Sequence, residues 1–453
     1  MENNKLFSEF EAISSKQWKQ QIQYELKGAD YNETLVWESP DGIKVKPFYH
    51  LDENSNFNSP PIPKNPFEIV QNIFVFDVQK SNQRALESLN KGAESIRFII
   101  DNEAIIIEEL LKNCNQIKAT FYFDLKFISI DFATKIAEFA KKNSLNCILL
   151  QDVIGNLSKE GNWYENKEND FEKLKQIASL DISSITVNST IYLNAGATIV
   201  QQLGYTLAHL NEYFNEIHTF KKQITIEVAI GANYFFEIAK LRALRLIINA
   251  LTKEYNFEIE CTILAIPSKR NKTIYDYNVN MLRTTTECMA AILGGANAIS
   301  NLPYDAIYHK DNEFADRIAR NQLLILKHES YFDKVANPAD GAYYIEELTN
   351  QLAEKALFLF KDIEKNGGFL SQLIEGTIQR KIQESASKEQ DAFDNNKEIL
   401  LGTNKYPNKN DAMKNELELF PFVKQKTRKT IITPIIEKRL AEKLEQDRLA
   451  LEG

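Results

Sequence analysis

Residues 277–300, YNVNMLRTTTECMAAILGGANAIS, together with the block FADRIARN at 314–321, decide the fold class of this chain. The first part carries apolar residues at helical spacing, so it predicts a helix over 277–293. Gly294 and Gly295 end that helix, because glycine leaves the right-handed conformation at little cost. Residues 296–300 then predict a short strand, and 314–328 a second helix. Helix, strand and helix in this order are one step of an alternating α/β chain.

The same alternation extends outward from this stretch. Candidate strands lie at 95–100, 118–124, 147–151, 184–188, 223–230, 259–265, 296–300 and 333–336. Helical patterns follow them at 104–111, 132–142, 171–180, 195–214, 235–255, 277–293, 314–328 and 345–363. About eight strand–helix pairs predict an α/β fold, a TIM (β/α)8 barrel. An open doubly wound sheet is the alternative, but Asp101-Asn102-Glu103 is unlike the Gly-rich loop that usually follows its first strand.

Different patterns flank the predicted barrel, which we place at residues 75–368. Residues 1–74 predict an N-terminal arm of helices and a hairpin, because Pro40-Asp41-Gly42 joins two short alternating segments. The arm is too small to bury a core of its own, so it needs another surface to lie on. Residues 369–453 are rich in charged side chains and predict a C-terminal helical extension.

Composition excludes several classes of function. Lys and Arg number 54 against 63 Asp and Glu, a net charge of −9, which argues against nucleic-acid and anionic-membrane partners. The first residues lack a secretory or mitochondrial targeting pattern and no apolar run is long enough to span a membrane, so we expect a cytoplasmic protein. The 4 cysteines form no CxxC pair, and the 5 histidines have no metal-ligand spacing, so no metal site is predicted.

Polar residues follow several of the predicted strands, at the end where barrel enzymes have their active sites. They are Asp101, Asp124, Asp152, Asn188, Ser268, Asn301 and Asp340. Carboxylates there can serve acid–base chemistry or bind a metal, but Asp and Asn are also favoured helix caps, and capping is the preferred interpretation for each. The strand segments RFII, TFYFD, CILL and ITIEVAI place some large apolar residues inward and predict a filled barrel core.

Long segments of the chain resemble methylmalonyl-CoA mutases. RTTTECMAAILGG at 283–295, FADRIARN at 314–321, YLNAGATIVQQLGYTLA at 192–208 and KVANPADGAYYIEELT at 334–349 look like segments of that family in the right order. The NAGA segment and SKRNKT at 268–273 resemble the small subunit of the heterodimeric bacterial enzyme in particular. The resemblance covers nearly the whole chain and implies the same (β/α)8 barrel.

The resemblance also implies a role. The family interconverts methylmalonyl-CoA and succinyl-CoA with adenosylcobalamin, and its small subunit is non-catalytic and supports a large catalytic subunit in a heterodimer. We therefore expect adenosylcobalamin to be bound by the partner subunit and not by this chain. The last histidine is His328, so residues 329–453 hold no family-type cobalt ligand. Residues 369–453 are accordingly expected to contain no cobalamin-binding domain.

Site residues of the family are replaced in this chain. By resemblance, Gly295 and Ser300 stand at histidine positions, and Ile266 stands at the position of a substrate-contacting glutamine. Losing these polar groups together predicts that the chain has no catalytic residue. The remaining candidate ligand positions at the barrel mouth are Ser268, Asn297, Ser300 and Asn301.

Two other hypotheses remain open at this point. The chain is alternatively the acyl-CoA-binding half of a split cobalamin-dependent mutase, although such a half should keep the histidine and the glutamine. A third hypothesis is a regulatory ligand at the barrel mouth. Acyl-CoA binding distinguishes both hypotheses from a supporting subunit.

Overall fold

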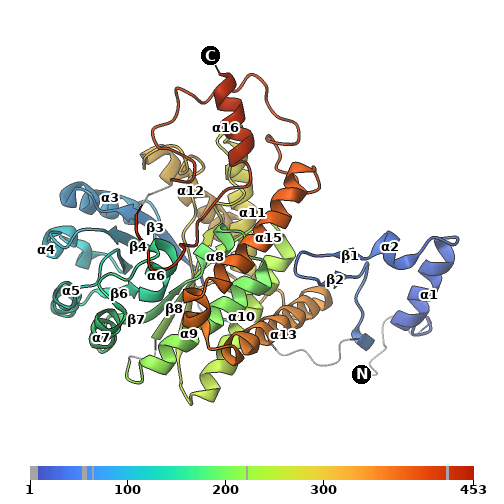
Figure 1. The fold of residues 1–453 in the computed structure, drawn as a ribbon, viewed down its shortest axis with the longest axis horizontal. Coiled ribbons are helices and arrows are strands. Elements are labelled where there is room, and N and C mark those ends of the chain that lie inside the picture. Colours follow the sequence, from blue (N-terminus) through green and yellow to red (C-terminus); the bar gives the residue numbers. More distant parts are fainter. Residues whose placement is uncertain (1–8, 54–58, 64–65, 221–222, 425–427, 453) are drawn as a thin grey trace.

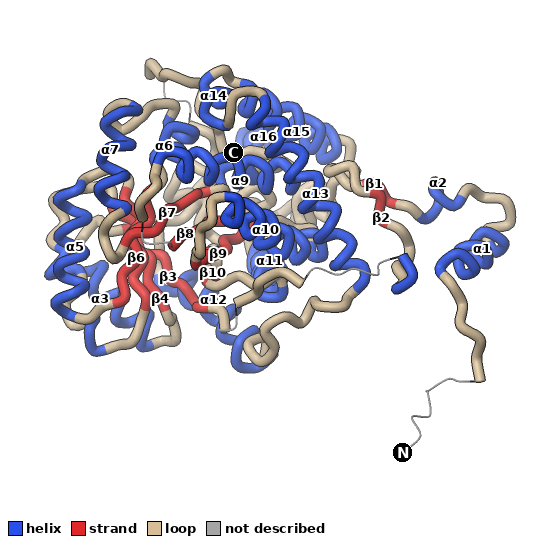
Figure 2. Tube along the Cα trace, turned by 90° about the horizontal axis from the view of Figure 1, so that it is seen from below, coloured by secondary structure: helices blue, strands red, loops and turns tan. Residues whose placement is uncertain are grey.

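The computed structural model describes residues 9–53, 59–63, 66–220, 223–424 and 428–452. Its centre is a closed barrel of parallel strands in the order β10-β3-β4-β5-β6-β7-β8-β9. Helices surround the strands on the outside of the ring (Figure 2). The predicted TIM (β/α)8 barrel is therefore confirmed.

The barrel strands are short and follow one another around the ring. They are β3 (Glu68–Phe74), β4 (Ser95–Ile100), β5 (Thr120–Leu125), β6 (Asn146–Gln151), β7 (Ser183–Asn188), β8 (Gln223–Ile230), β9 (Glu260–Pro267) and β10 (Ala298–Ile299). Although β10 has only 2 residues, Ala298 lies opposite both Glu68 of β3 and Leu264 of β9. That double pairing closes the ring.

Amphipathic helices cover the barrel. They are α3 (Val78–Asn90), α4 (Ile107–Leu110), α5 (Ile130–Asn143), α6 (Val153–Glu160), α7 (Lys167–Ala178), α8 (Thr190–Asn194), α9 (Ile199–Glu216), α10 (Tyr234–Glu254), α11 (Val279–Leu293), α12 (Glu313–Leu324) and α13 (Tyr343–Lys365), with a 3-10 turn at Cys114–Gln116 and a π-turn at Ile325–Glu329. α5 illustrates the pattern: the Ser129 side chain caps its first turn, and Phe132, Ile136 and Ala140 are buried at helical spacing.

One barrel strand was missed, and one predicted strand was wrong. β3 lies within residues 1–74, which we expected to be arm, and the helix α3 that follows it was not predicted. Residues 333–336 form turns ahead of Pro338 and make no strand. β3 is a strand because it pairs with β4 and β10, and those partners are distant in sequence from the Pro-rich segment that precedes it.

The N-terminal arm projects from the barrel (Figure 1). It consists of α1 (Ser15–Glu25), α2 (Tyr31–Leu35), the hairpin strands β1 (Trp37–Glu38) and β2 (Lys44–Val45), and a 3-10 turn at Leu51–Glu53. Ser14 and Gln17 form a capping box that begins α1. The hairpin touches the barrel where the Trp37 ring meets Phe236 of α10 with centroids 5.8 Å apart, whereas α1 extends beyond it.

The C-terminal extension contains α14 (Phe369–Ile374), α15 (Thr377–Asp394) and α16 (Glu442–Leu451). It begins with an aromatic contact: the Phe369 ring stacks on His209 of α9 with ring centroids 5.5 Å apart and planes inclined by 3°. Phe369 is fully buried. This contact fixes the start of the extension against the helix layer of the barrel.

Candidate functional site

The mouth of the barrel is the end at which the parallel strands finish, and Ser268 lies there, directly after β9. Ser268 is buried, and its hydroxyl donates to Asn194 Oδ1 at 2.9 Å and accepts from the Arg270 backbone N–H at 3.1 Å. Asn194 Oδ1 also accepts from the Lys269 backbone N–H at 3.0 Å. Ser268 thus holds the loop after β9 against α8, and its one hydroxyl proton is already used.

Ser300 and Asn301 also lie at the mouth, directly after β10. The Asn301 amide donates to Ala319 O and to Gln322 Oε1, both at 2.9 Å, which ties the strand to α12. The Ser300 hydroxyl and Asn301 Oδ1 are buried without a hydrogen-bond partner among the described residues. These two atoms are the polar groups that the predicted positions leave available to a ligand.

Asn297 and Gly295 lie at the opposite end of the barrel, because both precede β10. Asn297 Oδ1 accepts from the Ile263 backbone N–H at 2.9 Å, and its carbonyl accepts from Glu68 N, so it closes the barrel floor. Gly295 has φ +84°, and a Cβ there would lie 2.8 Å from the Ile62 side chain. The structure therefore separates Asn297 from Ser268, Ser300 and Asn301. Because Gly295 lies at the floor, its replacement of the family histidine says nothing about chemistry at the mouth. This differs from our inference from the resemblance.

Apolar side chains occupy the interior of the barrel. Buried residues from five of the strands form one contacting cluster, with Ile266 packed against it: Val70, Tyr122, Ile148, Leu150, Leu264 and Ala298. Because β5 and β9 stand on opposite sides of the ring, this cluster spans the axis. The prediction of a filled core agrees with this packing.

A buried ion-pair network also crosses the barrel interior. Arg97 of β4 lies 2.6 Å from Asp124 of the adjacent strand β5 and 2.6 Å from Glu227 of β8. β4 and β8 are four places apart in a ring of eight strands, so the Arg97–Glu227 contact joins opposite walls. We call Arg97, Asp124 and Glu227 the cross-barrel triad. It leaves no straight path along the axis at this level.

Burial and charge together set the ionisation of the triad. Burial opposes the charge of Arg97, but Glu227 and Asp124 outweigh it and raise its pKa. Burial also opposes ionisation of Asp124, but Lys126 and Arg97 lower its pKa. For Glu227 burial dominates and raises the pKa, although Arg97 acts against it. The triad is therefore a structural charge cluster whose members hold one another in place.

Of the predicted strand-end carboxylates, Asp152 is a helix cap, as we preferred. Its side chain accepts from Gly155 N at 2.7 Å in the first turn of α6. It also accepts from the Tyr213 hydroxyl at 2.6 Å and lies 3.0 Å from Nε2 of His209. His209 is fully buried. Asp124, by contrast, belongs to the triad and caps no helix.

Known proteins of similar sequence identify the family of this chain. The model of the methylmalonyl-CoA mutase family matches residues 128–451. The methylmalonyl-CoA mutase small subunit of Porphyromonas gingivalis (strain ATCC BAA-308 / W83) is 31% identical over an alignment that covers 100% of this chain and 79% of that one. This chain belongs to the methylmalonyl-CoA mutase family.

Other mutase subunits match as well. The small subunit of Streptomyces virginiae is 26% identical, with 89% of this chain and 72% of that one covered. The large subunit of the same P. gingivalis strain is 30% identical over 235 residues, which cover 49% of this chain and 33% of that one. P. gingivalis thus has both a small and a large subunit that are similar to this mutase-family chain.

In this mutase-family chain, residues 428–441 cross the barrel mouth, and we call this segment the strap. Backbone N–H groups of Ile432, Ile435 and Lys438 donate to carbonyls of Gly161, Ser158 and Asn194, at 3.2, 2.8 and 3.0 Å respectively. Leu440 N donates to Arg270 O at 2.9 Å. In Figure 1 the red trace of the strap runs beside α6 and α8. The strap therefore covers the loops that follow β6, β7 and β9.

Sequence reasoning missed Arg97 and Glu227. Both lie in strand segments that are otherwise apolar, SIRFII and QITIEVAI. A charged residue inside an apolar strand is rarely buried unless a partner of opposite charge is present, so the two segments held a usable signal. In the predicted ring of eight strands, 95–100 and 223–230 are already four places apart, so a pairing across the axis could have been inferred.

No group of three or more His, Cys, Asp or Glu side chains is arranged to hold a metal ion within the described part of the chain. The described helices also include none whose length and apolar character would suit a membrane crossing.

Proposed function

We propose that this chain is the small, non-catalytic subunit of a two-subunit methylmalonyl-CoA mutase. The observation that carries the proposal is the cross-barrel triad. A substrate that entered along the barrel axis would have to separate Arg97 from Glu227 and leave buried charges unpaired, which costs about 3–5 kcal/mol. It would also have to displace the apolar cluster around Tyr122. Both costs argue against substrate turnover in this barrel.

The residues at the mouth do not fit adenosylcobalamin, the cofactor on which this family depends. The strap occupies the face above β6, β7 and β9 through its own backbone hydrogen bonds. A corrin-sized group would have to displace it from that face. We therefore propose that the cofactor is held by the partner subunit, and we assign no reaction step to this chain.

A large catalytic subunit is the partner that this proposal requires. In its support, P. gingivalis has both a small and a large subunit with sequence similarity to this chain. The projecting arm carries exposed aromatic side chains, with Tyr24 81% and Trp18 49% exposed. Large exposed apolar groups of this kind are typical of a surface that another protein covers.

The acyl-CoA-binding half of a split mutase is the second candidate. The Ser300 hydroxyl and Asn301 Oδ1 at the mouth favour it, because buried polar atoms usually find a partner and these two have none in the described part of the chain. The cross-barrel triad opposes it.

The test compares the full-length chain alone, the large subunit alone and the two together, each with adenosylcobalamin and methylmalonyl-CoA. We expect succinyl-CoA only where the large subunit is present, and higher activity or stability when both are mixed. Succinyl-CoA formation by this chain alone would overturn the proposal. Calorimetric titration with methylmalonyl-CoA and no cofactor separates the second candidate, since a supporting subunit should give no binding heat.

A further inference from the structure

Arg245 of α10 differs from most buried cations of this protein, because no carboxylate contacts it among the described residues. The others pair with Asp or Glu side chains: Arg97, Lys240, Arg242, Arg270, Lys272, Lys327 and Arg439. Arg320 is the second exception, but it lies in the field of Asp316 and Glu313. A buried guanidinium without a counter-charge is costly, so Arg245 is a group that an anion would stabilise.

The guanidinium of Arg245 is held in place by neutral acceptors. Its Nη2 donates to Gly295 O at 2.7 Å and to Asn297 Oδ1 at 2.6 Å, and Nε donates to Gly295 O at 3.3 Å. Nη1 donates only to Cys261 O, at 3.4 Å. Since Nη1 carries two hydrogens, one of them has no acceptor among the described residues. The side chain is thus fixed by the barrel floor and keeps a donor free.

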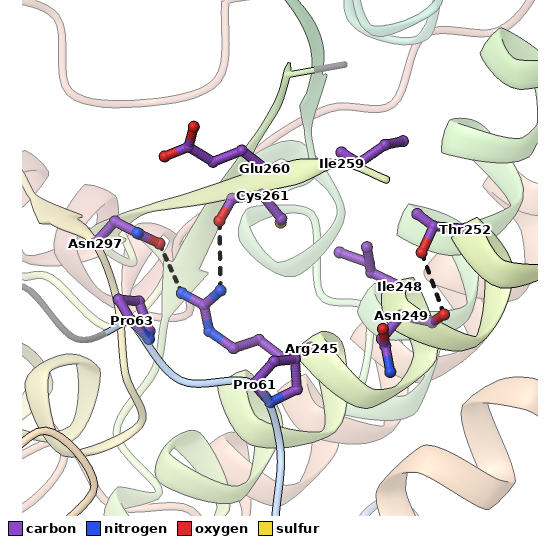
Figure 3. A pocket seen from close by; sticks show the side chains of 10 residues that line it. All are labelled: Pro61, Pro63, Arg245, Ile248, Asn249, Thr252, Ile259, Glu260, Cys261 and Asn297. Carbon is purple, nitrogen blue, oxygen red and sulfur yellow. Dashed lines mark hydrogen bonds between the residues drawn. The ribbon is translucent and has the colours of Figure 1, made fainter. Parts of the chain in front are cut away.

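Arg245 lines a cavity of about 330 Å³ between α10, the start of β9 and the Pro61–Pro63 segment. Figure 3 shows the guanidinium on the side of the cavity nearest β9, with Asn249 and Thr252 farther along α10, across the cavity from it. Pro61, Pro63, Ile248 and Ile259 supply apolar walls. Glu260 also lines the cavity, but Figure 3 shows its carboxylate turned away from the guanidinium.

We propose that this cavity binds a small anion that has an apolar body, with its carboxylate or phosphate paired to Arg245. A guanidinium fixed in its plane matches either anion, and the apolar walls suit a small hydrocarbon group. The volume lies at the lower end of the range for small-molecule sites. Because the cavity opens at the floor of the barrel, this site is separate from the mouth and does not depend on the role proposed for the chain.

Ligand-observed NMR on the full-length chain tests the site with benzoate, phenyl phosphate and neutral benzamide. We expect one or both anions to bind in the millimolar range or tighter, and benzamide to bind at least about tenfold more weakly. The two anions distinguish a carboxylate site from a phosphate site. Equal binding of benzamide and the anions, or binding of neither anion at millimolar concentrations, would overturn the proposal.

Two variants locate the binding. Arg245→Gln removes the cation and should abolish anion binding, but it also disturbs contacts to Gly295 and Asn297. Asn249→Asp keeps the shape of the wall and places a negative charge in the cavity, so anion binding should fall at least about tenfold. Asn278→Asp, exposed at the start of α11, is the matched control and should bind as the wild type does. Unchanged binding in Asn249→Asp would refute the assigned position.

Discussion

At the scale of single residues, Arg97 has the most demanding surroundings in the barrel. Its one guanidinium pairs with two buried carboxylates that approach it from different strands. Asp124 has one further cation in contact, Lys126, at 2.7 Å. The Lys126 side chain is 45% exposed, so water weakens this second ion pair. The stability of the barrel interior therefore depends strongly on this one side chain.

Arg97→Met should lower the free energy of unfolding by about 3–5 kcal/mol, because Asp124 and Glu227 remain buried with their main counter-charge removed. Urea denaturation at neutral pH measures this loss. Lys126→Met is the matched control and should cost less than about 1 kcal/mol, since that ammonium is half exposed. Adding Asp124→Asn and Glu227→Gln to Arg97→Met should recover part of the loss. If Arg97→Met alone were as stable as the wild type, the stabilising role of the triad would be contradicted.

Asp152 makes the stability depend on acid pH. Burial opposes its ionisation, but His209, the Asn188 N–H and the Tyr213 hydroxyl outweigh burial and lower its pKa. A lowered folded-state pKa adds stability above the unfolded pKa, about 3.9, and that stability is lost as pH falls below it. Asp152→Asn should therefore lose less stability between about pH 5 and pH 3 than the wild type. Asp101→Asn, at an exposed site, should behave as the wild type. If the unfolding free energy fell with pH equally in the wild type and both variants, the role of Asp152 would be disproved.

At the scale of elements, the strap has one face on the barrel and one in solvent. Ile432 and Ile435 are each 4% exposed, whereas their neighbours Ile431 and Ile436 are 62% and 53% exposed. The backbone bonds to Ser158 and Gly161 fix this alternation. Removing a buried side chain should therefore loosen the strap, whereas removing its exposed neighbour should not.

Ile435→Ala should lower the unfolding free energy by about 2–4 kcal/mol through lost burial and the cavity it leaves. Ile436→Ala should stay within about 0.5 kcal/mol of the wild type. Denaturant unfolding compares the two variants, and hydrogen exchange of the backbone amides at positions 435 and 438 reports whether the strap itself has opened. Equal losses in both variants would mean that the strap is not seated on the mouth as described.

Some of the strands could be predicted from the sequence, and one could not. The strands from β4 to β10 were found from their apolar runs between helical patterns, because those patterns are local. β3 was missed, since its neighbours β4 and β10 make it a strand and neither is adjacent to the Pro-rich loop before it. Asn297 was assigned to the mouth, although it precedes β10 and therefore lies at the floor. A shift of three residues along a short strand moves a side chain from one end of the barrel to the other.

At the scale of the whole molecule, the arm helices α1 and α2 project from the rest of the chain. Figures 1 and 2 both show α1 and α2 away from the barrel. The ring of Trp18 meets only Phe48, also in the arm, at 6.4 Å among the described aromatic contacts. These two helices thus gain little stability from the barrel, which fits the proposed contact with a large subunit.

Tyr24→Ser should weaken assembly with the large subunit at least about tenfold, because large aromatic side chains often dominate the binding energy of an interface. The same change should leave the unfolding free energy of the isolated chain within about 0.5 kcal/mol, since Tyr24 is 81% exposed. Tyr406→Ser, in the C-terminal extension and 76% exposed, is the matched control. Analytical ultracentrifugation of the mixed subunits measures both. Wild-type affinity in Tyr24→Ser would exclude this part of the arm from the interface.

The contact between Arg97 and Glu227 also has a mechanical consequence. A hollow ring of strands can widen or flatten when a neighbour presses on it, because only the hydrogen bonds between adjacent strands resist. Here two walls that face each other are joined through the centre, so any widening must first pull opposite charges apart where no water can solvate them. The ring therefore resists widening, and a protein bound to its outer surface contacts a stiffened barrel.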